Sequence, residues 1–189
     1  MDKIKESVAK YSEYVVDMRR YFHMHPEVGG EEYATQKRIM EELSSLGLKP
    51  RKAADTGVIA ELQGALPGKT VALRADIDAL PIQDEIEKPY RSQNDGKCHA
   101  CGHDGHMAML LAMAKVFVDM QSELKGNVRF LFQPSEERFP GGAERMIADG
   151  AMDGVDYVLG MHLWQPLQAG VAGICSGNMM AAPDEFTIS

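Results

Sequence analysis

The sequence contains few cysteines, no long apolar run and fewer basic than acidic residues, and each shortage argues against a class of protein. Its 20 Lys and Arg against 28 Asp and Glu give a formal net charge of −8, which disfavours a nucleic acid or an anionic membrane as partner, because both require a basic face. No apolar run reaches the length of a membrane span, and residues 1–6 (MDKIKE) lack the apolar segment of a signal peptide, so we expect a cytoplasmic protein. Three cysteines, an odd number, fit a reducing compartment better than a disulfide framework.

The remaining composition is that of one globular domain with strands and helices in alternation. With 189 residues, 44% hydrophobic and 25% charged, the chain is long enough for a full core, and it has no internal repeat. Apolar residues at three- and four-residue steps predict helices over 2–24 and 31–46, and a stretch that is apolar on nearly all sides predicts one over 107–120. Glycines before and after 143–149 bound a further short helix. Short apolar runs bounded by turn residues predict strands over 58–62, 70–76, 127–133 and 156–161, with a turn at 66–69.

The most improbable stretch is 98–106, which holds two of the three cysteines and three of the six histidines. Thiolates and imidazoles bind borderline-soft divalent metals, so we interpret it as a metal loop that opens the buried helix over 107–120. Cys101 and His103 are two residues apart and would point to different faces of a helix. We therefore expect the loop before the helix to present them.

Two less specific interpretations of the histidines and cysteines remain open. Cys98 and Cys101 form a C-x-x-C pair, which could be half of a structural zinc site or a redox pair, although Cys175 offers no matching second pair. Cys101 is the better ligand candidate because Gly102 and His103 follow it directly, whereas Cys98 could be a bystander. His23 and His25 precede a proline that favours a turn, and we disfavour them as ligands.

Polar side chains follow three of the predicted strands. Asp76 and Asp78 end the second strand and could bind a metal, orient a ligand or reach water. Glu136 and Glu137 follow the third; side chains alternate along an extended chain, so one could ligate while the other handles protons, or both could form a solvated acidic turn. His162 ends the fourth and, alone, would more often be a core residue. Because ligands bind at the carboxyl ends of parallel strands, this convergence favours a metal enzyme.

Four blocks carry a specific resemblance: 74–81 (RADIDALP), 99–106 (HACGHDGH), 132–137 (FQPSEE) and 160–162 (GMH). They resemble signature segments of the dinuclear metal-dependent amidohydrolases and peptidases, which include hippurate hydrolase, N-acyl-amino-acid deacylases, aminoacylase and plant auxin-conjugate hydrolases. The resemblance implies a three-layer α/β/α fold of the zinc-peptidase type with a mixed, mostly parallel sheet. It also implies two divalent ions, Zn, Mn, Ni or Co, and an N-acyl amino acid or peptide-like substrate.

The resemblance further implies a role for each site residue. The metal ligands would be Cys101, His103, Glu137 and His162. Glu136 would be the general base that takes a proton from a metal-activated water and returns it to the departing amine, and Asp76 the supporting active-site aspartate. In many relatives a ligand histidine occupies the position of Arg74, and we expect Cys101 to substitute for it.

Family members are considerably longer than this chain. By that resemblance, residues 1–178 are the N-terminal part of the metal-binding catalytic domain and residues 179–189 begin a lid and dimerisation domain. A further ligand histidine would lie beyond them, so we expect a fragment or truncated product, and a homodimer only where the lid is present. The alternative function is an inactive metal-binding domain or a structural zinc protein that uses Cys98 and Cys101.

We predict that Cys101→Ser lowers metal affinity far more than Cys98→Ser, because only Cys101 adjoins the Gly102–His103 pair. Metal content of the two purified variants, measured by inductively coupled plasma mass spectrometry, tests this prediction. Equal losses in both variants would favour the structural zinc site.

Overall fold

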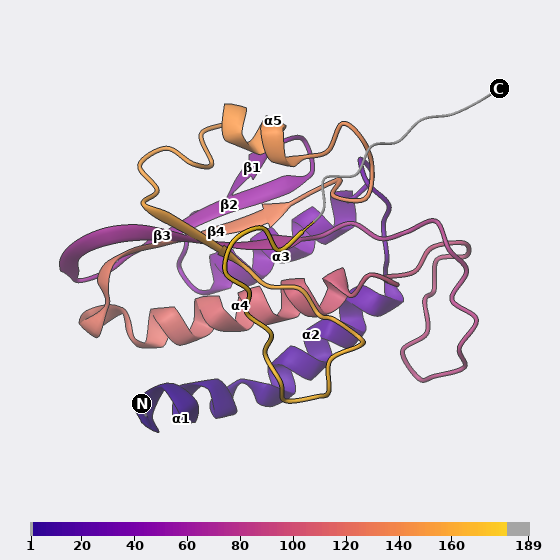
Figure 1. Cartoon of the computed structure of the whole chain (residues 1–189), viewed down its shortest axis with the longest axis horizontal. Helices are drawn as coiled ribbons and strands as arrows, with labels where there is room; N and C mark the ends of the chain where they lie inside the picture. The colour runs from indigo at the N-terminus through magenta and orange to yellow at the C-terminus, as the bar shows by residue number, and fades with distance from the viewer. Residues whose placement is uncertain (1, 181–189) are drawn as a thin grey trace.

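The computed structural model describes residues 2–180, which form three layers (Figure 1). Four helices lie along one face of a five-stranded sheet, and one short helix lies on the other face. The helices are α1 (Asp2–Lys10), α2 (Ser12–Met24), α3 (Tyr33–Ser45), α4 (His103–Asp119) and α5 (Ala143–Ala148), with a 3-10 turn η1 (Gln121–Glu123) after α4. The strands are β1 (Arg51–Ala53), β2 (Gly57–Gln63), β3 (Leu66–Asp76), β4 (Lys125–Gln133) and β5 (Tyr157–Gly160). The predicted three-layer α/β fold is confirmed.

The sheet is mixed, as predicted, with strand order β1-β2-β4-β3-β5. Strand β3 runs parallel to both β4 and β5, whereas β1–β2 and β2–β4 are antiparallel. Parallel pairings, expected to predominate, therefore only equal the antiparallel ones among residues 2–180. The register pairs Asp76 with Gln133 and Arg74 with Gly160, so the carboxyl ends of β4, β3 and β5 lie at one edge. The predicted site residues that end or follow these strands therefore lie at the same edge of the sheet.

The main core lies between the sheet and helices α2, α3 and α4. Phe22, Leu43, Leu111, Phe130 and Phe132 are each at most 1% exposed. A smaller core on the other face packs Met146 of α5 against the sheet. Helix α4 is buried over most of its length, as its nearly uniform apolar sequence predicted, and it carries the histidine stretch at its amino end.

The helix predicted over 2–24 is broken in two at Tyr11. Tyr11 leaves helical geometry, with φ −106° and ψ 12°, and its hydroxyl donates to the Asp119 carboxylate at 2.7 Å. Lys10 binds the same carboxylate at 2.7 Å. These contacts turn α1 against the end of α4, a tertiary effect that helical periodicity alone cannot reveal.

The turn predicted at 66–69 lies earlier in the chain. The strands that it connects, β2 and β3, are not neighbours in the sheet, because β4 lies between them. The chain reverses at Gly64 and Ala65, and residues 66–69 already belong to β3, with an irregular register beside β4. A Cβ on Gly64 would lie 2.3 Å from the carbonyl oxygen of Gly126, so only glycine allows this close backbone approach. The short strand β1 was not predicted.

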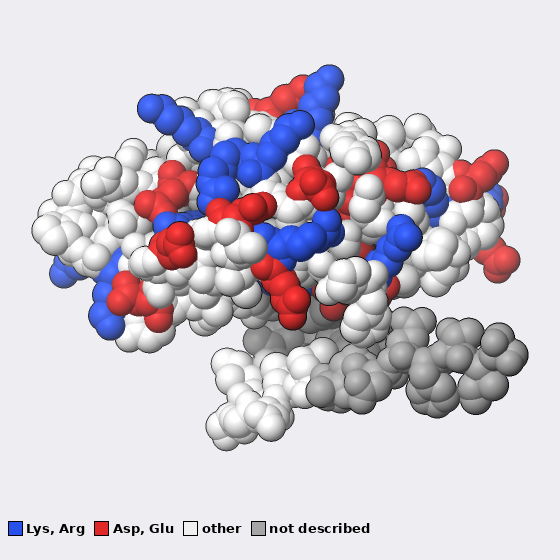
Figure 2. All heavy atoms as spheres, turned by 90° about the horizontal axis from the view of Figure 1, so that it is seen from above, with Lys and Arg blue, Asp and Glu red and all other residues white. Residues whose placement is uncertain are grey.

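No helix within residues 2–180 is both long and apolar enough to cross a membrane. On the face seen from above, basic and acidic side chains stand next to one another (Figure 2). Ion pairs of this kind occur on the sheet and on α5, where Arg129 binds Glu61 at 2.7 Å and Arg145 binds Asp55 at 2.9 Å.

We predict that Leu111→Ala lowers the free energy of unfolding by about 2–5 kcal/mol, because it leaves a cavity between α4 and the sheet. The exposed Ile147 provides the matched control, and Ile147→Ala should change the free energy of unfolding by less than about 0.5 kcal/mol. Urea denaturation followed by circular dichroism measures both. Similar losses in the two variants would contradict the position of the main core.

Candidate metal centre

The structure brings the six predicted site residues to the carboxyl edge of the parallel strands. Asp76 ends β3, Glu136 and Glu137 follow β4, and His162 follows β5. Cys101 lies in the loop before α4, as predicted, but His103, expected in the same loop, is the first residue of the helix, which begins earlier than residue 107. Gly102 caps α4 at φ +88°, a left-handed conformation that lets the loop turn directly into the helix.

His103 is the centre of this arrangement. Its ring is fully buried and its Nδ1 donates to the carbonyl oxygen of Asp78 at 2.9 Å, which leaves a lone pair on Nε2. That Nε2 has no hydrogen-bond partner. Carboxylate oxygens of Asp76, Glu137 and Glu136 surround it at 3.6, 3.7 and 3.8 Å. These distances are too long for hydrogen bonds but suit ligands that share one cation.

Cys101 and His162 form the other side of the cluster. The Cys101 Sγ lies 3.4 Å from the Nε2 of His162. The Nδ1 of His162 donates to the carbonyl oxygen of Leu163 at 2.6 Å, so its Nε2 carries the lone pair and faces the Cys101 sulfur. Ligand atoms of Cys101, His103 and His162 lie within 4.8 Å of one another, as do those of His103, Glu136 and Glu137.

The chemistry of these donors fits a pair of borderline-soft divalent cations. The site offers two imidazole nitrogens, one sulfur and several carboxylates. His103 belongs both to the group with Cys101 and His162 and to the group with Glu136 and Glu137. Burial, a hydrogen bond with Glu137 and the surrounding carboxylate charges raise the pKa of the Cys101 thiol to about 12. A divalent cation would reverse this balance and favour the thiolate.

Asp76 is held from two sides. His106 donates from Nδ1 to its carboxylate at 2.5 Å, and Arg74 donates at 2.7 Å. Burial works to raise the pKa of Asp76, but the His106 hydrogen bond and the neighbouring His103 and Arg74 side chains hold it at about 2. The guanidinium of Arg74 thus pairs with Asp76 at the position where a ligand histidine was expected in relatives.

His106 links this carboxylate to the His162 segment. Its Nε2 accepts the backbone N–H of Leu163 at 2.8 Å, which fixes the residue directly after His162. No separate role for His106 was predicted from the sequence. Its spacing of three residues from His103 on α4 could have shown that both rings lie on the same face of the helix.

The prediction that Glu136 and Glu137 point to opposite sides is wrong. The chain is not extended there, because Ser135 has φ +50°, a conformation that costs an L-residue roughly 1–2 kcal/mol. Both glutamates therefore approach the same Nε2 of His103. Asp78, which the sequence left open, is buried: one carboxylate oxygen lies 3.5 Å from the Nδ1 of His103, and the two oxygens accept the N–H groups of Glu136 and Glu137, each at 3.0 Å.

The two glutamates nevertheless differ in their surroundings. The Glu136 side chain is 41% exposed and that of Glu137 is 24% exposed. Burial and the negative charge of Glu137 raise the pKa of Glu136. Glu136 is thus the more accessible of the two carboxylates, and its surroundings make it more basic than an ordinary glutamate.

Cys98 lies in a different buried group, together with His23 and Asp84. Both nitrogens of His23 already face carboxylates, Asp104 at 2.7 Å and Asp84 at 3.2 Å. Cys98 also forms a backbone bridge with Leu80. These contacts tie the loop before α4 to α2, and they place Cys98 and Cys101 in separate clusters.

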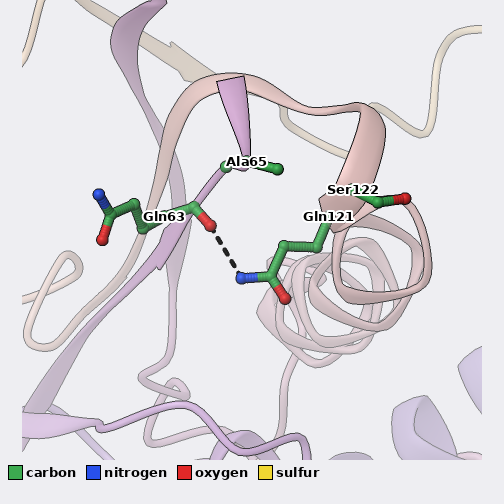
Figure 3. Close-up of a pocket in the computed structure, with 5 residues that line it drawn as sticks. Gln63, Ala65, Gln121 and Ser122 are labelled. Carbon is green, nitrogen blue, oxygen red and sulfur yellow. Dashed lines mark hydrogen bonds between the residues drawn. The ribbon is translucent and has the colours of Figure 1, made fainter. Parts of the chain in front are cut away.

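A shallow pocket of about 400 Å³ lies at the opposite end of the sheet (Figure 3). Gln63, Gly64, Ala65, Gln121 and Ser122 line it, and the amide of Gln121 donates to the carbonyl oxygen of Gln63 at 2.8 Å. It contains no titratable side chain. The concentration of acid, imidazole and thiol groups makes the carboxyl edge the candidate site.

The chain is similar to several known proteins. Residues 72–178 match the model of peptidase family M20/M25/M40. The chain is 50% identical over 188 residues to an N-acyl-L-amino acid amidohydrolase of Geobacillus stearothermophilus, covering 99% of this chain and 51% of that protein. It is 42% identical over 175 residues to the IAA-amino acid hydrolase ILR1-like 2 of Arabidopsis thaliana, covering 92% and 39%.

Among solved structures, the chain is similar to a dinuclear metal binding peptidase of the M20 family from Bacillus subtilis. The TM-score is 0.78 at 40% sequence identity, and the match covers 86% of this chain and 45% of that chain. The chain spans about half the length of the curated relatives it matches.

We predict that His106→Asn weakens zinc binding by about 10- to 100-fold, whereas His106→Gln weakens it less. The Asn amide can replace Nδ1 toward Asp76 but cannot reach Leu163. The Gln amide oxygen can replace Nε2 as acceptor of the Leu163 N–H and so preserve the position of His162. Titration with zinc against a chelating dye distinguishes them, and weaker binding by the Gln variant would contradict the role of the Leu163 bond.

Proposed function

The chain belongs to peptidase family M20/M25/M40, and from this premise we propose that it carries the metal-binding part of a hydrolase that cleaves the amide bond of N-acyl amino acids. One observation carries the proposal: the buried Nε2 of His103, without a hydrogen-bond partner, faces three carboxylates. A protein with a purely structural zinc site has no use for an additional carboxylate that is not a ligand.

In this proposal Cys101, His103, Glu137 and His162 hold two divalent ions of Zn, Mn, Ni or Co. The ions, when bound, polarise the scissile carbonyl and increase the acidity of water. The Nε2 lone pairs of both histidines support their assignment as ligands, because each ring has its Nδ1 hydrogen fixed by a carbonyl oxygen.

Glu136 acts as the general base. It takes a proton from the attacking water and returns it to the departing amine, and its raised pKa makes it a stronger base toward the water. Asp76 supports the site by holding His106 on one side and facing His103 on the other. Asp78 keeps both glutamates in place through their backbone N–H groups.

The names of the relatives support an N-acyl amino acid, or a related amino acid conjugate, as the substrate. Residues 1–178 form part of the catalytic domain in this proposal, and residues 179–189 begin the lid, through which a homodimer forms. Residues 181–189 lie outside the part of the chain that the structure describes. The alternative is a metal-binding domain of the same family without activity of its own.

We predict that Glu136→Gln retains bound zinc but lowers the turnover of an N-acetyl amino acid by at least about 100-fold, because the base is lost while the ligands remain. Glu137→Gln is the matched variant and should lose zinc. Metal content by mass spectrometry and release of the free amino acid measure the two effects.

Two outcomes would contradict the assignment. Loss of zinc from Glu136→Gln with retention in Glu137→Gln would reverse the two roles. An unaltered protein that binds two ions but hydrolyses no N-acyl amino acid would favour the inactive metal-binding domain.

A further inference from the structure

Glu32 is a fully buried carboxylate outside the blocks that carry the family resemblance. It stands at the start of α3, but its side chain points into the protein rather than capping the helix. One oxygen accepts the N–H of Gly30 at 2.7 Å and the hydroxyl of Thr56 at 2.6 Å. The other accepts the N–H of Ser135 at 2.8 Å and its hydroxyl at 3.4 Å. All four partners are donors, and none is a basic side chain.

Ser135 is the residue whose left-handed backbone aims the two glutamates at His103. Glu32 accepts hydrogen bonds from the amide and the hydroxyl of Ser135. The carbonyl oxygen of Ser135 accepts the N–H of Gly142 at 3.2 Å. The next two amides, of Glu136 and Glu137, are held by Asp78. Two buried carboxylates from separate loops therefore hold three successive N–H groups in the turn after β4.

We propose that Glu32 is a positioning residue for the metal centre: by holding Ser135 at positive φ, it directs both Glu136 and Glu137 toward His103. The proposal rests on the proposed function in so far as the glutamates serve a metal site. It assigns to α3 a direct part in the geometry of that site, although no residue of α3 lies among the candidate ligands.

The close packing around this turn supports a positional role. Gly29 lies so near that a Cβ on it would meet the Cα of Ser135 and the carboxylate of Asp78, each at 3.2 Å. Without its acceptor, Ser135 would relax from the left-handed region, and the side chains of both glutamates would rotate with the backbone. Glu32→Gln changes the volume little and leaves one acceptor oxygen in place of two, so either the two donors of Ser135 or the pair from Gly30 and Thr56 then face an NH2 group.

The neighbouring Glu31 provides a matched control. It is exposed and forms an ion pair with Lys97 at 2.8 Å. Glu31→Gln makes the same chemical change one residue away and should alter zinc affinity by less than about twofold, as expected for an exposed ion pair.

The first experiment measures zinc affinity of the purified protein by competition with a chelating dye. We expect Glu32→Gln to weaken zinc binding by about 10- to 100-fold. Adding Ser135→Gly to Glu32→Gln should recover up to about tenfold, since glycine adopts positive φ without the cost that serine bears. A role limited to overall stability would not be rescued by glycine at this position. Zinc affinity unchanged in Glu32→Gln would overturn the proposal.

The second experiment measures amide deuterium exchange of Ser135, Glu136 and Glu137 in metal-free protein. Glu32→Gln should speed exchange at this turn, and Glu31→Gln should not. This separates the two proposals: an unaltered protein that binds no zinc counts against the proposed function, whereas unchanged exchange in Glu32→Gln overturns the role of Glu32.

Should Glu32→Gln fail to fold, Ser135→Gly and Ser135→Val test the same bond from its other end. Valine disfavours positive φ, so Ser135→Val should speed amide exchange and weaken zinc binding. Ser135→Gly should retain the exchange rate and the zinc affinity of the unaltered protein. Equal behaviour of the two variants would overturn the proposal.

Discussion

The hydrogen bond from His103 to the carbonyl oxygen of Asp78 connects the end of β3 to the start of α4, and the geometry of the candidate site depends on it. It fixes the hydrogen of His103 on Nδ1 and turns Nε2 toward the carboxylates. The same Asp78 uses its side chain to hold the amides of Glu136 and Glu137. One residue therefore sets both the direction of the imidazole and the position of the acids that face it.

The second constraint is the concentration of negative charge. Asp76, Asp78, Glu136 and Glu137 gather around one buried ring, an arrangement that is costly unless basic groups, backbone N–H groups or cations compensate it. Asp78 is compensated by amides and Asp76 by Arg74 and His106. The two glutamates have no such basic partner among residues 2–180 beyond His103, which is consistent with a site whose charge balance includes cations.

The sequence predicts the strands and the meeting of their ends, because apolar patterning and the topology of α/β sheets are local and general properties. It predicts that α4 is buried for the same reason. The break at Tyr11 and the reversal at Gly64 depend on contacts with Asp119 and Gly126, which are distant in sequence. The positive φ of Ser135 likewise depends on Glu32, about a hundred residues earlier, and no local pattern indicates that pair. The roles of Cys101, His103, Glu137 and His162 come from family resemblance and stay predictions.

Strand β5 precedes His162 and, within the described chain, is paired on one side only, and Tyr157, Val158 and Leu159 are each at least half exposed. If this strand detaches part of the time, only the fraction of molecules with β5 docked can use all the donors. The apparent dissociation constant for an ion then equals the intrinsic constant divided by that fraction. Any contact that covers the free edge of β5 would tighten ion binding without touching the ion itself, so the sheet edge and the metal centre are thermodynamically linked.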